Sequence, residues 1–121
     1  MVECLVVGIG GFIGSVCRYL IGLIPVREGW IFPVKTFLIN IVGAFVIGMI
    51  AAATVKNSTL SPRLVLFLKV GVCGGFTTFS SFALETGDLI QSGSARLALL
   101  YAVLSMAAGV AAVFAGEAVI R

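Results

Sequence analysis

The sequence predicts an all-α membrane protein, with four transmembrane helices in each chain and a third helix that is broken near its middle. The chain has 121 residues, of which 60% are hydrophobic and only 11% are charged. At about 20 apolar residues per crossing, this length holds four spans and short loops in a single membrane domain, residues 1–121. The third apolar run contains the pair Gly74-Gly75 followed by four hydroxyl residues. In lipid, such an interruption indicates a broken helix buried against protein or water.

The composition also limits the function. The chain has no histidine, a net charge of +3, and three cysteines without CxxC spacing, which we interpret as small buried hydrophobic residues. The lysines and arginines form no basic patch, so no nucleic-acid partner is expected. No nucleophile and base pair is evident either, and we expect the protein not to be an enzyme.

The first span is predicted over residues 2–24. Its first charge is Glu3 and no cleavage pattern follows it, so we interpret it as a retained helix and not as a signal peptide. Its glycines favour close packing of helices over a dinucleotide-binding loop, because their spacing is GxGGxxG and no strand precedes them. Arg18 lies near the end of the span. It either reaches back to the membrane interface or provides a vestibule charge that attracts anions.

The second span is predicted over residues 34–55 and carries polar residues near its start. Thr36 and Asn40 are four positions apart, which places them on one face of a helix. Asn40 lies about a turn and a half inside the span, where its amide must find a partner. Either a hydrogen bond to another helix or donation to an anion in a pore would provide that partner.

The third span is predicted over residues 63–91, with the break at Gly74-Gly75. A broken helix leaves unpaired carbonyls and amides that can bind cations and anions. Phenylalanines recur at every third position after the break and form one stripe of the following helix: Phe76, Phe79 and Phe82. From spacing alone, core packing explains this stripe. Glu85 and Asp88, near the end of the span, are either an interfacial charge pair or vestibule groups.

The fourth span, predicted over residues 96–120, is rich in alanine and glycine, which is typical of tightly packed membrane helices. Tyr101 and Ser105 are four apart and give this span a polar stripe. Taken alone, Tyr101 fits an interfacial anchor near the end of a span.

The distribution of positive charge predicts how the chains assemble. Each side of the membrane receives four lysines and arginines when four spans are threaded: Lys56, Arg63, Lys69 and Arg121 on the terminal side, and Arg18, Arg27, Lys35 and Arg96 on the other. Because no excess fixes the orientation, chains can insert either way. We therefore predict a dual-topology (antiparallel) homodimer, with the broken helices meeting at the midplane.

The segment GGFTTFSSF, residues 74–82, resembles the signature of the Fluc (CrcB) family of fluoride channels. The resemblance extends over essentially the whole chain, with Asn40 in the second span and glycines and Arg18 in the first. Ser81 stands where threonine is frequent in the family, which keeps a hydroxyl. The resemblance implies a passive, selective channel that exports fluoride across the plasma (inner) membrane of a prokaryote and so lowers its toxicity.

The resemblance also implies roles for particular residues. A structural sodium ion (Na⁺) is expected at the dimer centre, held by the backbone carbonyls of Gly74 and Thr77 from both subunits. Phe79 and Phe82 are expected to line the fluoride routes as phenyl edges, with Asn40 donating to the ion. The further pathway positions that the resemblance implies are Ser81, Thr36, Tyr101 and Ser105, with Arg18 in the vestibule.

A small dual-topology multidrug-type proton antiporter is the alternative. Such antiporters need a carboxylate in the middle of the first span, and this span has only Glu3, at its edge.

Overall fold

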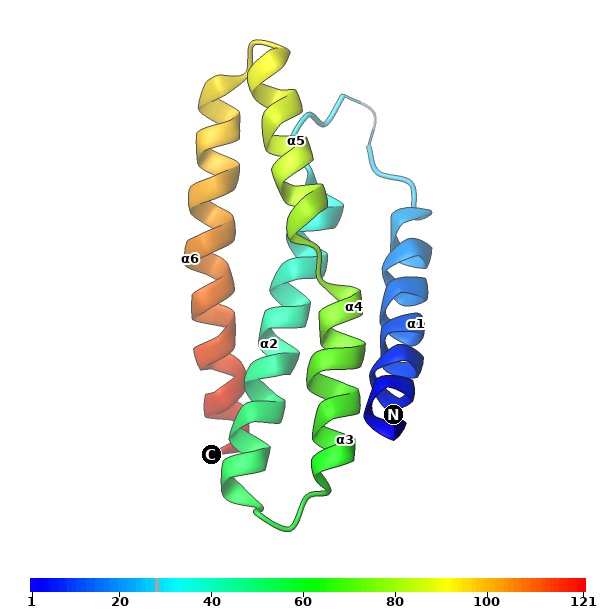
Figure 1. Ribbon diagram of the computed structural model, residues 1–121. Coiled ribbons are helices and arrows are strands. Elements are labelled where there is room, and N and C mark those ends of the chain that lie inside the picture. Colours follow the sequence, from blue (N-terminus) through cyan, green and yellow to red (C-terminus); the bar gives the residue numbers. More distant parts are fainter. Residues whose placement is uncertain (28) are drawn as a thin grey trace.

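The computed structural model describes residues 1–27 and 29–121 and contains four segments that are long and apolar enough to cross a membrane. These segments are Val2–Gly22, Val34–Lys56, Pro62–Gln91 and Ala95–Ile120. Their bounds agree with the predicted spans to within two residues at each end. Both termini lie at the same end of the helix bundle, as an even number of crossings requires (Figure 1).

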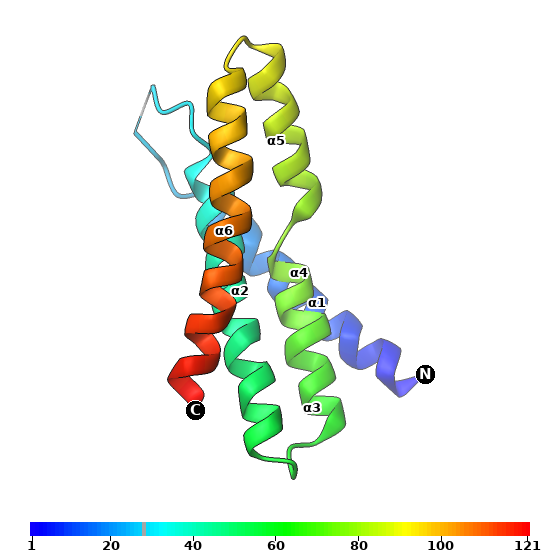
Figure 2. The same ribbon diagram turned by 90° about the vertical axis from the view of Figure 1, so that its left-hand side faces the viewer.

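Helix α1 (Val2–Gly22) packs against the third segment through its glycines. A Cβ atom on Gly10 would lie 2.6 Å from the carbonyl oxygen of Phe67, and one on Gly75 would lie 2.6 Å from that of Gly11. Only glycine allows backbones to approach so closely. The predicted packing role of these glycines is confirmed, and Figure 2 shows α1 inclined to the helices it supports.

Helices α2 (Val34–Lys56) and α6 (Ala95–Ile120) form the most extensive helix pair. Gly48 of α2 lies against the backbone of Val113, and Gly116 of α6 lies against the backbone of Phe45. A side chain at either glycine would run into the opposing carbonyl. These two contacts hold the C-terminal halves of α2 and α6 together.

The third segment is a series of short helices with one extended interruption. It consists of α3 (Pro62–Leu66), the π-helix η1 (Phe67–Cys73), α4 (Gly74–Phe76) and α5 (Phe79–Gln91). Thr77 (φ −79°, ψ 156°) and Thr78 (φ −146°, ψ 114°) separate α4 from α5 and are extended. Thr78 caps α5, because its Oγ1 accepts a hydrogen bond from the N–H of Ser81 at 3.1 Å.

The predicted position of the break is therefore wrong by about one turn. Gly74 and Gly75 are helical. Gly75 lies against the backbone of α1, so the absence of a side chain there serves helix packing and does not end the helix. The break falls at Thr77-Thr78, where a threonine hydroxyl can cap the next helix. Phe76 consequently belongs to α4, and only Phe79 and Phe82 lie on the helix that follows the break.

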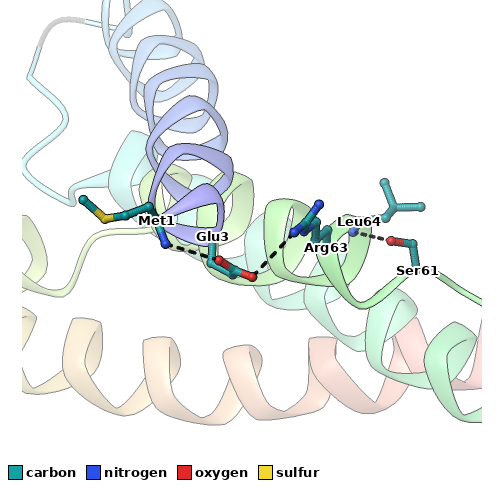
Figure 3. A network of polar contacts seen from close by, with 5 residues as sticks. All are labelled: Met1, Glu3, Ser61, Arg63 and Leu64. Atoms are coloured by element: carbon teal, nitrogen blue, oxygen red, sulfur yellow. Dashed lines mark hydrogen bonds and ion pairs between the residues drawn. The ribbon is translucent and has the colours of Figure 1, made fainter.

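Polar contacts lie at both ends of α1 and at the start of α3. At the N-terminal end of α1, Glu3 pairs with the Met1 amino group at 3.6 Å and with Arg63 at 3.9 Å (Figure 3). Ser61 caps α3 by accepting from the N–H of Leu64. At the other end of α1, the Nζ of Lys35 donates to the carbonyl of Gly22 at 2.7 Å. Glu3 is exposed, so its pairs contribute little to stability.

Candidate ion pathway

Asn40 of α2 holds the broken segment in place. Its Oδ1 accepts from the N–H of Thr78 at 2.8 Å, and its Nδ2 donates to the carbonyl of Thr78 at 3.1 Å. These bonds satisfy backbone groups that the break removes from helical pairing, as backbone at membrane depth requires. Of the two alternatives for the Asn40 amide, a hydrogen bond to another membrane segment is thus present, to the extended residue Thr78. An amide nitrogen carries two hydrogens, so a second N–H of Asn40 remains for another acceptor.

A crevice of about 410 Å³ opens beside the break, between α2, α4, α5 and α6. Four of the residues expected in the fluoride pathway line it, namely Asn40, Phe79, Phe82 and Ser105, together with the two expected sodium ligands, Gly74 and Thr77. None of the residues that line it carries a titratable carboxyl or amino group. The crevice therefore offers neutral donors and ring edges.

Ser105 is the polar group in this crevice that lacks a partner. Its Oγ is buried and makes no hydrogen bond to any described residue. A buried hydroxyl without a partner is destabilising by about 1–3 kcal/mol. Its position in the crevice wall leaves it free to donate to a bound ligand.

The two phenylalanines of α5 have different surroundings. Phe79 is 79% exposed in the single chain, so core packing does not explain it. Phe82 lies between Phe79 and Tyr101, with ring centroids 5.8 Å and 4.9 Å away, respectively. Core packing is thus correct for Phe82 and wrong for Phe79. Both rings line the crevice, where the edge of a phenyl ring carries partial positive charge.

Deeper in the protein, Glu85 joins Thr36 and Tyr101. Its Oε2 accepts from the Thr36 hydroxyl at 2.7 Å, and its Oε1 accepts from the Tyr101 hydroxyl at 2.8 Å. Tyr101 is fully buried, so the interpretation of this residue as an interfacial anchor is wrong. Glu85 is half-buried and belongs to this cluster instead of to an interfacial charge pair. Its spacing of four residues from Ser81 was the signal in the sequence that could have placed it on the pathway face.

Arg18 is half-buried and bonded to the third segment. Its Nε donates to the carbonyl of Gly75 in α4 at 3.2 Å. A cation is favourable there, because the carbonyl end of a helix is partially negative. Arg18 therefore does not reach back to the membrane interface but lies against the helix that precedes the break.

The carbonyls of Gly74 and Thr77 are suited to a hard cation such as sodium. Neither oxygen accepts a hydrogen bond from any described residue, because the N–H of Thr78 is taken by Asn40 and that of Ser81 by Thr78. Unpaired carbonyls at a broken helix are the ligands that sodium uses in membrane proteins. The Thr77 hydroxyl donates its hydrogen to the carbonyl of Cys73 at 2.9 Å.

Ser81 is not among the residues that line the crevice. Its backbone N–H closes the cap of α5, and it is half-buried. Its expected contact with the ion stays a prediction.

Comparison with known proteins identifies relatives over nearly the full length of the chain. Residues 5–117 match the model of a family described as CrcB-like protein, Camphor Resistance (CrcB). A protein of Chlorobaculum tepidum named fluoride-specific ion channel FluC is 47% identical over 116 residues, covering 96% of this chain and 92% of the relative. Proteins with the same name are 43% identical in Agrobacterium fabrum (100% and 98% covered) and in Methanopyrus kandleri (96% and 87% covered).

Proposed function

This chain belongs to the CrcB family, and on that premise we propose that it is a passive, highly selective fluoride channel that exports fluoride from the cytoplasm. The family consists of ion channels, which are not enzymes, and the four spans make the chain a multi-pass membrane protein. The relatives named above come from bacteria and an archaeon, which agrees with the plasma (inner) membrane of a prokaryote. Export would lower the toxicity of fluoride to the cell.

The unpartnered hydroxyl of Ser105 is the observation that carries this proposal. Ser105 lines one crevice with Asn40, Phe79 and Phe82, so residues that carry a hydroxyl, an amide and two phenyl rings surround a common space. A small, strongly hydrated anion can give up its water only where several close donors replace it. Fluoride is such an anion, and these neutral groups can donate to it without releasing protons.

The cluster of Thr36, Tyr101 and Glu85 continues the proposed route on the side of α5. An anion that reaches this cluster can accept from the two hydroxyls in place of Glu85. When no fluoride is bound, the Glu85 carboxylate would accept from the two hydroxyls and keep them oriented. Its negative charge would also favour the release of a bound anion. Ser81 lies four residues before Glu85 on α5. It would provide a further hydroxyl between the crevice and the cluster of Thr36, Tyr101 and Glu85.

No coupling ion is needed for export in this mechanism. A membrane potential of 100 mV, negative inside, favours the exit of one anion by about 2.3 kcal/mol. A charge that moves with the potential makes transport electrogenic. The Arg18 side chain, bonded to α4, would make the electrostatic potential near the vestibule more positive and so attract anions.

A second, antiparallel copy of the chain would complete the site. Phe79 and Gly74 are exposed although both line the crevice, so one face of the pathway is open in the single chain. The equal distribution of positive charge permits insertion in both orientations. Sodium at the carbonyls of Gly74 and Thr77 from both subunits would supply a fixed positive charge between the broken helices.

Fluoride efflux from liposomes that contain the purified protein tests the proposed activity. Efflux is followed with a fluoride electrode after valinomycin allows potassium to carry the compensating charge, with chloride as the comparison. Fast efflux that requires valinomycin and excludes chloride is expected. No efflux, or efflux that requires a proton gradient, would contradict a passive channel.

The orientation of single chains is tested separately. Tags at the chain termini in cells should report both orientations in comparable amounts, and a single orientation would exclude dual topology. The multidrug-type antiporter has no support of its own. Glu3 is the only carboxylate of α1, lies in its first turn and is exposed.

A further inference from the structure

We propose that a second crevice, at the C-terminal ends of α2 and α6, binds an anionic phospholipid. The crevice has a volume of about 370 Å³ and is lined by residues of these two helices. It begins about one turn beyond the pathway crevice on α2, at Ala51 as against Ile47, and the two crevices share no lining residue. The proposal therefore does not depend on which ion the protein conducts.

The packing of α2 on α6 explains where this crevice forms. Gly48 and Gly116 bring the two backbones into contact just before the crevice begins, at Ala51 on α2 and at Glu117 on α6. Beyond them, the facing positions of α2 hold Ala51 and Ala52, whose short side chains cannot fill the space up to α6. The two helices therefore touch at the glycines and leave an apolar gap near their ends.

The walls and the rim of the gap have different chemistry. The walls are the apolar side chains of Ala51, Ala52 and Val55, whereas the rim carries Lys56, Glu117 and Arg121. Arg121 and Glu117 neutralise each other in an ion pair of 3.1 Å. Apolar walls match an acyl chain, and a charged rim matches the headgroup of the same lipid.

Lys56 supplies the positive charge that selects an anionic headgroup. Its Nζ donates to the carbonyl of Ile120 at 2.9 Å, and no carboxylate of the described residues lies within ion-pairing distance. An ammonium group has three hydrogens, so two remain for phosphate oxygens. Lys56 ends α2 and Ile120 ends α6, which places this charge at the level of the lipid headgroups.

Binding of dioleoyl phosphatidylglycerol to the purified, intact protein in detergent tests the proposal by native mass spectrometry, with dioleoyl phosphatidylcholine for comparison. The wild type should bind the anionic lipid more tightly. Lys56→Gln removes the charge but keeps a donor for Ile120, and it should weaken that binding about fivefold, the effect of one surface cation. Lys56→Arg should restore it, and Arg96→Gln, at the opposite end of α6, should leave it unchanged.

A second variant tests the apolar part of the site. Ala52→Phe fills the gap and should reduce binding of the long-chain lipid, with the oligomeric state checked by size-exclusion chromatography. Ala52→Leu replaces it if the phenylalanine variant does not fold. Equal affinity for the two lipids, or no effect of Lys56→Gln, would overturn the proposal. Displacement of the lipid by millimolar inorganic phosphate would also overturn it, since the site would then bind a free anion.

Discussion

Asn40 and Thr78 are joined by two hydrogen bonds that connect α2 to the break in the third membrane segment. The Asn40 amide accepts from the N–H of Thr78 at 2.8 Å and donates to its carbonyl at 3.1 Å. The Asn40 side chain thus provides the hydrogen-bond partners that the backbone N–H and C=O of Thr78 would have in a helix. The same side chain also lines the crevice in which the unpartnered hydroxyl of Ser105 lies. Stability of the break and contact with the ion therefore depend on the same amide.

Asn40→Asp separates these two roles. The carboxylate can still accept from the N–H of Thr78, but it donates nothing and repels an anion. We expect fluoride efflux from liposomes to fall at least tenfold while the protein still folds. Asn40→Ala should lose efflux as well and be destabilised by about 1–3 kcal/mol, because the backbone groups of Thr78 lose their partner. Wild-type efflux in Asn40→Asp would show that the amide does not contact the ion.

Ser105→Ala should affect stability and transport in opposite ways. Removing a buried hydroxyl that has no partner should raise the free energy of unfolding by up to about 1–3 kcal/mol, less what the lost packing of the Oγ atom costs. If the hydroxyl donates to fluoride, the same substitution should slow efflux severalfold. Ser105→Thr, which keeps the hydroxyl, is the matched control. A slower rate in both variants would point to shape and not to hydrogen bonding.

Phe79→Ile and Phe82→Ile should differ in stability but agree in transport. Phe82 packs against Tyr101 with ring centroids 4.9 Å apart, so its loss should destabilise the protein by about 0.5–1.5 kcal/mol beyond the change in buried area. Phe79 is mostly exposed in the single chain and should contribute less to the protomer. Both substitutions remove a ring edge from the crevice and should slow fluoride efflux. Retention of full efflux in both variants would argue for a purely structural role.

Gly75→Ala should destabilise the packing of α1 on the third segment. Its new methyl group would lie 2.6 Å from the carbonyl of Gly11, and backbone must move to accept it. Overpacking of this kind costs about 1–3 kcal/mol. Gly8→Ala, on the same helix α1 as Gly11 but with nothing within 4 Å, is the control and should be tolerated. Thermal unfolding in detergent measures both.

Thr77→Ser tests how sodium is held. If the backbone oxygen of Thr77 is the ligand, the serine variant should keep sodium binding, measured as sodium-dependent protection against thermal unfolding. Its hydroxyl can still donate to the carbonyl of Cys73, as the threonine hydroxyl does at 2.9 Å. Sodium binding that is lost in an otherwise intact protein would contradict a carbonyl ligand.

Much of the architecture follows from the sequence alone. Four apolar runs set the four spans, because a bilayer of fixed thickness demands about 20 apolar residues for each crossing. The glycines of α1 predicted close packing, since backbones approach closely only where side chains are absent. The motif of residues 74–82 predicted the family, which the matched family model confirms.

Tertiary contacts decided the rest. The break lies at Thr77-Thr78 and not at Gly74-Gly75. Gly75 packs against the backbone of α1 as part of a helix, whereas Asn40 pairs with the backbone of Thr78. Tyr101 looked like an interfacial residue by its position in the chain, yet it is buried and donates to the carboxylate of Glu85. Arg18 fitted either an interfacial anchor or a vestibule charge, and its position is decided by its bond to the carbonyl of Gly75. Residue type and spacing specify where a helix crosses a membrane. They do not specify which buried polar groups meet, because those partners come from helices far apart in the sequence.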